Sequence, residues 1–316
     1  MTDQQAYNRR ETNMRLILPL LVLMMPMTAR ADVPKVVTDI APIHSLVAQV
    51  MSGVGVPDVL ISGAASPHDF QFTFVQAEAV QDADLVIWVG ADLTPWLGEA
   101  LETLTTSDNE LELLASENWP SLERRDWGDD HDDHGHDDHG HDDDSILDPH
   151  AWLNPQVAMV WTRHIALALR SLDPENEAAY LANADATVAR LIQLDQEIAA
   201  QMADLPRGGI LVPHDAYQYF GQRYDVPAVG TISLSDAASP NPAQIAELRD
   251  LVREDGISCV LSDPQTRREW VDLVRDGSSA RTAIADPMGT AFAPGPDHYE
   301  QTLRGIAAAY AQCLGG

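Results

Sequence analysis

Residues 173–202 read DPENEAAYLANADATVARLIQLDQEIAAQM, a long run with apolar side chains at helical spacing. We expect Asp173 to cap this helix and Pro174 to occupy its first position, where the missing N–H of proline is tolerated. The helix should extend for about 28 residues, or roughly 42 Å, and end before the Leu-Pro-Arg-Gly-Gly segment at 205–209. It is too long for one crossover in a small domain and lies near the middle of the chain. We therefore interpret it as a strut that joins two lobes.

Short apolar runs alternate with helical patterns on the amino-terminal side of this strut. We expect strands at 35–40, 56–61, 84–89 and 111–114, and helices at 43–51, 74–82, 95–105 and 156–172. This alternation is typical of a parallel sheet whose strands are connected by crossover helices.

The same alternation resumes after the strut. We expect strands at 209–212, 228–232 and 257–261, a further extended run at 282–285, and helices at 217–224, 241–254, from Trp270 onward and at 299–314. The predicted fold is α/β, with two lobes that each hold a small parallel sheet and flanking helices, joined by one long rigid helix. Ligands of such sheets bind beyond the carboxyl ends of the strands, which places a site in the cleft between the lobes.

The amino terminus has the pattern of a secretory signal peptide. Three arginines precede the apolar run 16–27, and Ala29-Arg30-Ala31 follows as an A-x-A cleavage signal. The apolar run is too short for a permanent membrane-spanning helix. We therefore expect a signal peptide at 1–31, an amino-terminal lobe at 32–172, a linking helix at 173–203 and a carboxyl-terminal lobe at 204–316, in a soluble protein exported to the periplasm.

The only two cysteines are Cys259 and Cys313. In a chain exported to an oxidising compartment, an even pair indicates a disulfide. A thiolate metal site fits poorly because the two residues are far apart and neither belongs to a C-x-x-C pair. We expect a disulfide that closes a loop of about 54 residues and contributes roughly 4 kcal/mol through loop-closure entropy.

The chain carries a formal charge of −30 over 316 residues. Ten of its 49 acidic residues lie between Asp126 and Asp144, so this tract exaggerates the imbalance without creating it. A field of this sign repels nucleic acid and concentrates cations near the surface. Nucleic-acid binding is therefore excluded as a function class.

The acidic tract at 126–144 also holds five histidines, His131, His134, His136, His139 and His141. Short His-rich tracts are typical of metal binding, and imidazole and carboxylate suit zinc and neighbouring metals. An acidic linker without function is the alternative. We expect a disordered loop whose histidines are weak, accessory zinc ligands.

Four further residues lie where strands are expected to end. His68 follows the second strand, His150 lies in the turn at 148–155 before a helix, His214 follows the first strand of the second half, and Asp286 follows the late extended run. Three imidazole nitrogens and one carboxylate oxygen complete a tetrahedral zinc shell. Each histidine taken singly could equally be a capping or core residue.

The chain resembles the zinc-specific, ZnuA-type branch of the cluster A-I solute-binding proteins of metal-importing ABC transporters. The motifs that carry the resemblance are Ser66-Pro67-His68-Asp69, the turn at 148–155, Pro213-His214-Asp215-Ala216-Tyr217 and Asp286-Pro287-Met288-Gly289. The His-rich insertion and the late cysteine pair are similar to that branch as well. The resemblance covers residues 32–316.

This resemblance implies a high-affinity periplasmic protein, without enzymatic activity, that holds Zn²⁺ between its lobes and changes little on loading. It implies the permease and ATPase subunits of a zinc importer as partners, and we expect a monomer. Manganese and iron members have a glutamate where this sequence has His214, and a third imidazole favours zinc. The identity of the fourth ligand is not decided, because some zinc members use water or another carboxylate in place of Asp286.

Several other residues near the expected strand ends are given structural roles. His44 is expected at a helix start near the cleft, and His164 and His298 as structural or exposed residues. Asp263 ends another strand and is a candidate to orient a metal-bound imidazole. Trp152 and Tyr217 are expected to pack around the site.

Three other functions remain open at this point. A zinc hydrolase would need an open coordination position and an adjacent base, and the sequence contains no H-E-x-x-H motif. A zinc buffer or donor would use the His-rich tract as its principal site. A metal-binding adhesin shares the fold.

Overall fold

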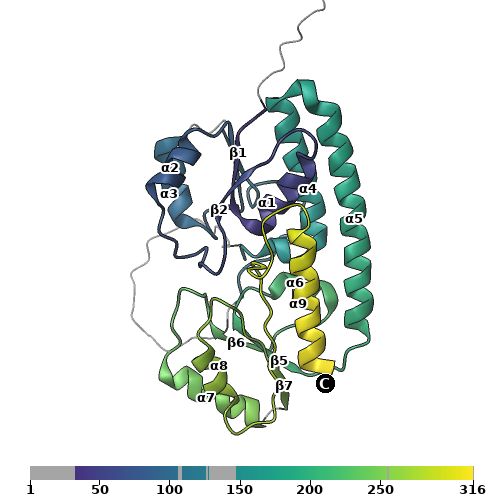
Figure 1. The fold of residues 1–316 in the computed structure, drawn as a ribbon. Coiled ribbons are helices and arrows are strands. Elements are labelled where there is room, and N and C mark those ends of the chain that lie inside the picture. The colour runs from purple at the N-terminus through teal and green to yellow at the C-terminus, as the bar shows by residue number, and fades with distance from the viewer. Residues whose placement is uncertain (1–32, 106–108, 126, 128–146, 255, 316) are drawn as a thin grey trace, which may run out of the picture. The chain divides into compact units, whose positions relative to one another are not determined.

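In this computed structural model, two parallel sheets lie at opposite ends of the described fold (Figure 1). The described residues are 33–105, 109–125, 127, 147–254 and 256–315, so the predicted signal peptide, and the His-rich tract apart from Trp127, lie outside them. The first sheet has the order β2-β1-β3-β4 and the second the order β6-β5-β7, with every pairing parallel. The predicted α/β fold is confirmed.

The first lobe is built as the sequence alternation predicts. Its strands are β1 (Val36–Ile40), β2 (Asp58–Ile61), β3 (Leu85–Trp88) and β4 (Glu110–Glu112), and its helices α1 (Ala41–Val50), α2 (Phe74–Gln81), α3 (Pro95–Leu104) and α4 (Pro155–Leu172). Helix α4 begins at a proline, and the Asn154 side chain accepts from the backbone N–H of Gln156. This cap satisfies a donor that has no partner within the helix.

The second lobe repeats the architecture with a smaller sheet. Its strands are β5 (Gly209–His214), β6 (Gly230–Ser233) and β7 (Ile257–Val260), and its helices α6 (Gln218–Tyr224), α7 (Pro242–Glu254), α8 (Arg268–Arg275) and α9 (His298–Gly315). The extended run expected at 282–285 makes only isolated parallel bridges, such as that between Ser262 and Ile284. It therefore lies beside β7 without forming a strand.

Helix α5 (Glu177–Ala203) is the predicted strut, and it has 27 residues. The prediction that Asp173 caps it is wrong. Residues Pro174–Asn176 form a separate 3₁₀ turn, and the Asp173 carboxylate makes no capping bond. One of its oxygens instead accepts from the Asn176 amide, at 2.7 Å, and from the Tyr180 hydroxyl, at 2.8 Å. These side-chain donors replace the backbone N–H that a cap would bind.

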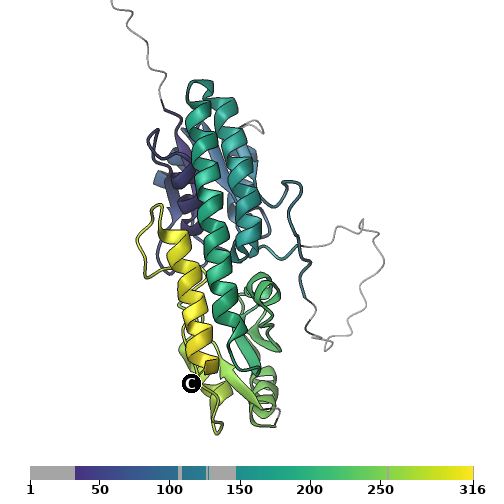
Figure 2. The same cartoon turned by 90° about the vertical axis from the view of Figure 1, so that its right-hand side faces the viewer.

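Helix α5 packs against α1 and α4 of the first lobe and against α6 and α9 of the second (Figures 1 and 2). One apolar core runs through both lobes, and a small second cluster lies around α7 and α8. The lobes also meet directly, because the Ser45 hydroxyl of α1 donates to the Pro296 carbonyl and accepts from the N–H of Tyr299. The connection between the lobes is therefore broader than a single helix.

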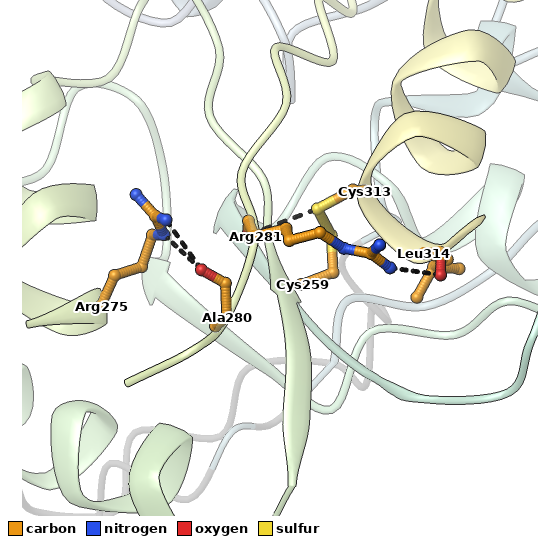
Figure 3. Close-up of a disulfide and its surroundings, with 6 residues drawn as sticks. All are labelled: Cys259, Arg275, Ala280, Arg281, Cys313 and Leu314. Carbon is orange, nitrogen blue, oxygen red and sulfur yellow. Dashed lines mark hydrogen bonds between the residues drawn. A yellow bond between two sulfur atoms is a disulfide. The ribbon is translucent and has the colours of Figure 1, made fainter. Parts of the chain in front are cut away.

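The predicted disulfide is present and joins Cys259 of β7 to Cys313 of α9 (Figure 3). Cys313 Sγ lies 3.5 Å from the backbone carbonyl oxygen of Arg281, and the Arg281 guanidinium donates to the carbonyl of Leu314. Both cysteines are fully buried. The end of α9 is thereby fixed to the second sheet.

Among the described helices, none is both long and apolar enough to cross a membrane.

Candidate metal centre

Three predicted ligands from different parts of the chain come together. His214 is the last residue of β5, His68 lies in the loop after β2, and His150 lies in the turn before α4. The ring centroids of His68 and His150 are 5.3 Å apart, and those of His150 and His214 are 5.5 Å apart. Two imidazoles of the first lobe thus meet one of the second.

The spacing of the first two rings matches a shared tetrahedral ion. Two nitrogen ligands at about 2.0–2.1 Å from one tetrahedral zinc lie about 3.3–3.4 Å from each other. The Nε2 atoms of His68 and His150 are 3.3 Å apart. Both rings therefore present nitrogens at the separation that zinc requires.

The imidazole of His150 is held by a carboxylate two residues before it. Asp148 Oδ1 accepts from the ring Nδ1 of His150, at 2.9 Å, and from its backbone N–H, at 3.0 Å. Because Nδ1 carries the proton in this contact, the Nε2 lone pair is free for a metal. This role of Asp148 was not predicted from the sequence, although an aspartate two residues before a histidine is typical of a local turn of this kind.

The imidazole of His214 is held in the same way, as predicted, by Asp263. Its ring Nδ1 lies 2.8 Å from Asp263 Oδ2, and both residues are buried. The other oxygen of Asp263 accepts from the backbone N–H groups of Gln265 and Thr266. The backbone of its own turn thus fixes the Asp263 carboxylate, and the carboxylate orients the ring of His214.

The environment sets the protonation of the three rings. Burial lowers the pKa of His150 well below its usual value, and burial together with the neighbouring His150 lowers the pKa of His68 to about 3. Burial also lowers the pKa of His214, but the carboxylates of Asp263, Asp236 and Asp215 together outweigh it and the net shift is upward. The rings of His68 and His150 are therefore neutral near pH 7, the form that binds metal, whereas zinc competes with a more tightly held proton at His214.

The supporting carboxylates can be tested by substitution. Asp148→Ala and Asp263→Ala should each lower zinc affinity about 10–100-fold, because a metal-binding imidazole loses the acceptor that orients it. Asp263→Asn should also lower the affinity, because its single amide oxygen can accept either from the ring or from the backbone N–H groups of Gln265 and Thr266. Competition titration against a chelator measures this, with exposed Asp250→Ala on α7 as control. Wild-type affinity in both alanine variants would contradict these roles.

The predicted fourth ligand, Asp286, lies in a turn whose own groups surround its carboxylate. One oxygen accepts from the N–H groups of Met288 and Gly289, both at 3.0 Å. The other accepts from the N–H of Thr290, at 2.6 Å, and from its hydroxyl, at 2.7 Å. Within the described ranges, no group of three or more His, Cys, Asp or Glu side chains has the spacing of a metal site. The ligand roles of the three histidines and Asp286 thus stay predictions.

Trp152 and Tyr217, expected only to pack, also hold the chain on either side of Asp286. The indole N–H of Trp152 donates to the carbonyl of Pro287, at 2.9 Å. The Tyr217 hydroxyl donates to the carbonyl of Ala285, at 2.7 Å. Because each belongs to the turn of one histidine, the turns of His150 and His214 are both bonded to that of Asp286.

A cavity of about 360 Å³ opens beside His68 and His150. Arg124, Arg125 and Asp215 also line it. The Arg125 guanidinium pairs with the Asp215 carboxylate, which also accepts from the indole N–H of Trp127, at 2.9 Å. The segment that leads into the His-rich tract is therefore bonded to the residue directly after His214, a contact that no sequence pattern indicated.

The remaining described histidines lie outside this group. Buried His44 donates to the carbonyl of Pro57, and half-buried His164 donates to that of Glu117. His298 begins α9 and is buried. Their structural roles agree with the sequence analysis.

Comparison with known proteins identifies the family. The family model described as "Zinc-uptake complex component A periplasmic", ZnuA, matches residues 36–313. The chain belongs to the ZnuA family. The protein named "High-affinity zinc uptake system protein ZnuA" of Paracoccus denitrificans is 38% identical over 308 residues, which cover 91% of this chain and 94% of that protein.

Solved structures with less sequence similarity share the fold of this family member. A crystal structure of ZnuA superimposes with a TM-score of 0.73 at 22% identity, covering 90% of this chain and all of the other. The SBP FpvC from Pseudomonas aeruginosa, in complex with Mn²⁺, gives a TM-score of 0.75 at 17% identity, covering 90% and 99%. A protein solved in complex with Mn²⁺ thus shares the fold of this chain.

Proposed function

We propose that this protein binds Zn²⁺ through His68, His150 and His214, with Asp286 completing the shell, and delivers it to an ABC importer. The observation that carries the proposal is the 3.3 Å separation between Nε2 atoms of His68 and His150. It is supported by the carboxylates behind His150 and His214, which aim both rings. Membership of the ZnuA family supports the same cargo.

Zinc is favoured over manganese by the donor set. Three imidazole nitrogens suit a borderline-soft ion that accepts tetrahedral coordination, whereas manganese prefers oxygen ligands and higher coordination numbers. A closed shell of four protein ligands leaves no position for the reactive water of a zinc hydrolase. Zinc-dependent hydrolysis that His150→Ala abolishes would support the hydrolase instead.

The compartment and partners follow from the same proposal. Residues 1–31 direct export, and the mature protein from Asp32 acts as a periplasmic monomer. Its lobes, at 32–172 and 204–316, present loaded zinc to the permease, which the ATPase drives. The description of the family as periplasmic supports this placement.

Removing the His-rich tract separates a transport receptor from a zinc buffer. A mature protein lacking 129–144 should keep one tightly bound zinc and lose only weak additional zinc, because the structured histidines lie outside the deletion. Isothermal titration with zinc measures the amounts of tightly and weakly bound zinc. Competition with manganese measures the preference of the tight site for zinc. A matched control replaces the five tract histidines with asparagine and keeps the length of the tract. Loss of the tight zinc in either variant would favour the buffer.

A further inference from the structure

A hydrogen bond joins the two lobes beside His68. The Ser66 hydroxyl, in the loop after β2, donates to Asp236 Oδ1, in the loop after β6, at 2.8 Å. Both side chains are half-buried. The contact brings a carboxylate of the second lobe to the loop that carries a ligand of the first.

Ser66 also fixes the backbone at His68. Its hydroxyl oxygen accepts from the N–H groups of His68 and Asp69, both at 3.2 Å. A hydroxyl has one proton to donate and two lone pairs to accept with. All three are used here, with the single proton committed to Asp236. The direction of that proton therefore determines how the oxygen faces the two N–H groups.

The three imidazoles are not supported equally. The ring Nδ1 atoms of His150 and His214 each lie within 3 Å of a carboxylate oxygen. Among the hydrogen bonds of the described residues, the only ring contact of His68 is the one to His150. The placement of His68 thus depends on its backbone.

The position of Asp236 follows from the pairing of β5 with β6. His214 pairs with Ser233 at the carboxyl ends of these strands, and Asp236 follows three residues later. The loop is braced internally, because the Ser233 hydroxyl lies 2.7 Å from the carbonyl of Ser235 and 2.9 Å from that of Ala238. Asp236 is therefore carried on the same rigid strand ends that position His214.

We infer that Asp236 is a positioning residue of the metal centre, which holds His68 against the second lobe through the Ser66 hydroxyl. The inference rests on the proposed zinc site and deepens it. The approach of the lobes and the placement of His68 are therefore coupled, because the hydrogen bond from Ser66 to Asp236 joins the lobes and also fixes the loop that carries His68. Asp236 contributes no metal–oxygen bond in this arrangement.

A double-mutant cycle tests this coupling. Ser66→Ala and Asp236→Ala should each lower the zinc affinity of the mature protein about tenfold, the low end for residues that orient a ligand. Because Asp236 acts through the Ser66 hydroxyl, the double variant should bind zinc no more weakly than Ser66→Ala alone. Asp236→Asn should recover part of the affinity, since its amide oxygen still accepts from Ser66. Additive losses would overturn the inference.

Cobalt spectra distinguish positioning from direct ligation. With Co²⁺ in place of zinc, the visible absorption bands of Asp236→Ala should match those of Ser66→Ala and wild type. A band change in Asp236→Ala alone would make Asp236 a ligand and overturn the inference. Asp250→Ala is the control for loss of a carboxylate from this lobe. If wild type binds no tight zinc, the proposed function fails; if it does and both single variants match it, the positioning role alone fails.

Discussion

Replacing His214 with alanine should weaken zinc binding by the mature protein roughly a hundred- to a thousandfold. Structural zinc sites bind with about 10–16 kcal/mol, so one of four ligands accounts for roughly 2.5–4 kcal/mol, or about two to three decades in Kd. His214 supplies the only imidazole of the second lobe in the group. Its loss would leave Asp286 as the only proposed ligand from the second lobe.

Competition titration with a chromophoric chelator measures this loss. His164→Ala is a matched control, because it removes an imidazole that lies outside the group and donates to the carbonyl of Glu117. That variant should bind zinc as tightly as wild type. Unchanged affinity in His214→Ala would remove His214 from the zinc shell.

Removing the disulfide should lower the free energy of unfolding by about 4 kcal/mol, from the loop-closure entropy of a long loop. The two cysteines are 54 residues apart in the sequence. In the variant with both replaced by alanine, the unfolded chain gains freedom that the crosslink removes. The zinc affinity of the folded variant should change little, because the disulfide lies away from the site. Cys259 pairs with Ile210, which is four residues from His214 along β5.

Urea unfolding followed by circular dichroism gives the free energy directly. Wild type unfolded in the presence of a reductant is the companion measurement, and its midpoint should approach that of the double variant. Equal stability of oxidised wild type and the double variant would show that the crosslink contributes nothing.

The fold was largely predictable because its signals are local. Buried strands such as Leu85–Trp88 are unbroken apolar runs, and α5 has a helical pattern over 27 residues. The start of α5 was mispredicted because Asp173 has a competing partner, the Tyr180 hydroxyl, which is apparent only once the helix is packed. The single core shared by both lobes likewise depends on how α1, α5 and α9 meet, which periodicity does not reveal.

The site was predictable only in part, because some of its contacts form only when distant segments pack together. His68, His150 and His214 were found because each follows or precedes a recognisable strand or turn, and because they match a family pattern. The roles of Asp236 and Arg125 depend on contacts between segments 170 and 90 residues apart in the sequence. The enclosure of Asp286 by its own turn depends on backbone conformation, including a positive φ at Gly289.

The most direct test of the zinc site is anomalous diffraction at the zinc absorption edge from crystals of the zinc-loaded mature protein. A single strong peak should lie about 2.0–2.1 Å from the Nε2 atoms of His68, His150 and His214. A peak that lacks any one of these three contacts, or one found only within the His-rich tract, would contradict the proposed three-imidazole centre.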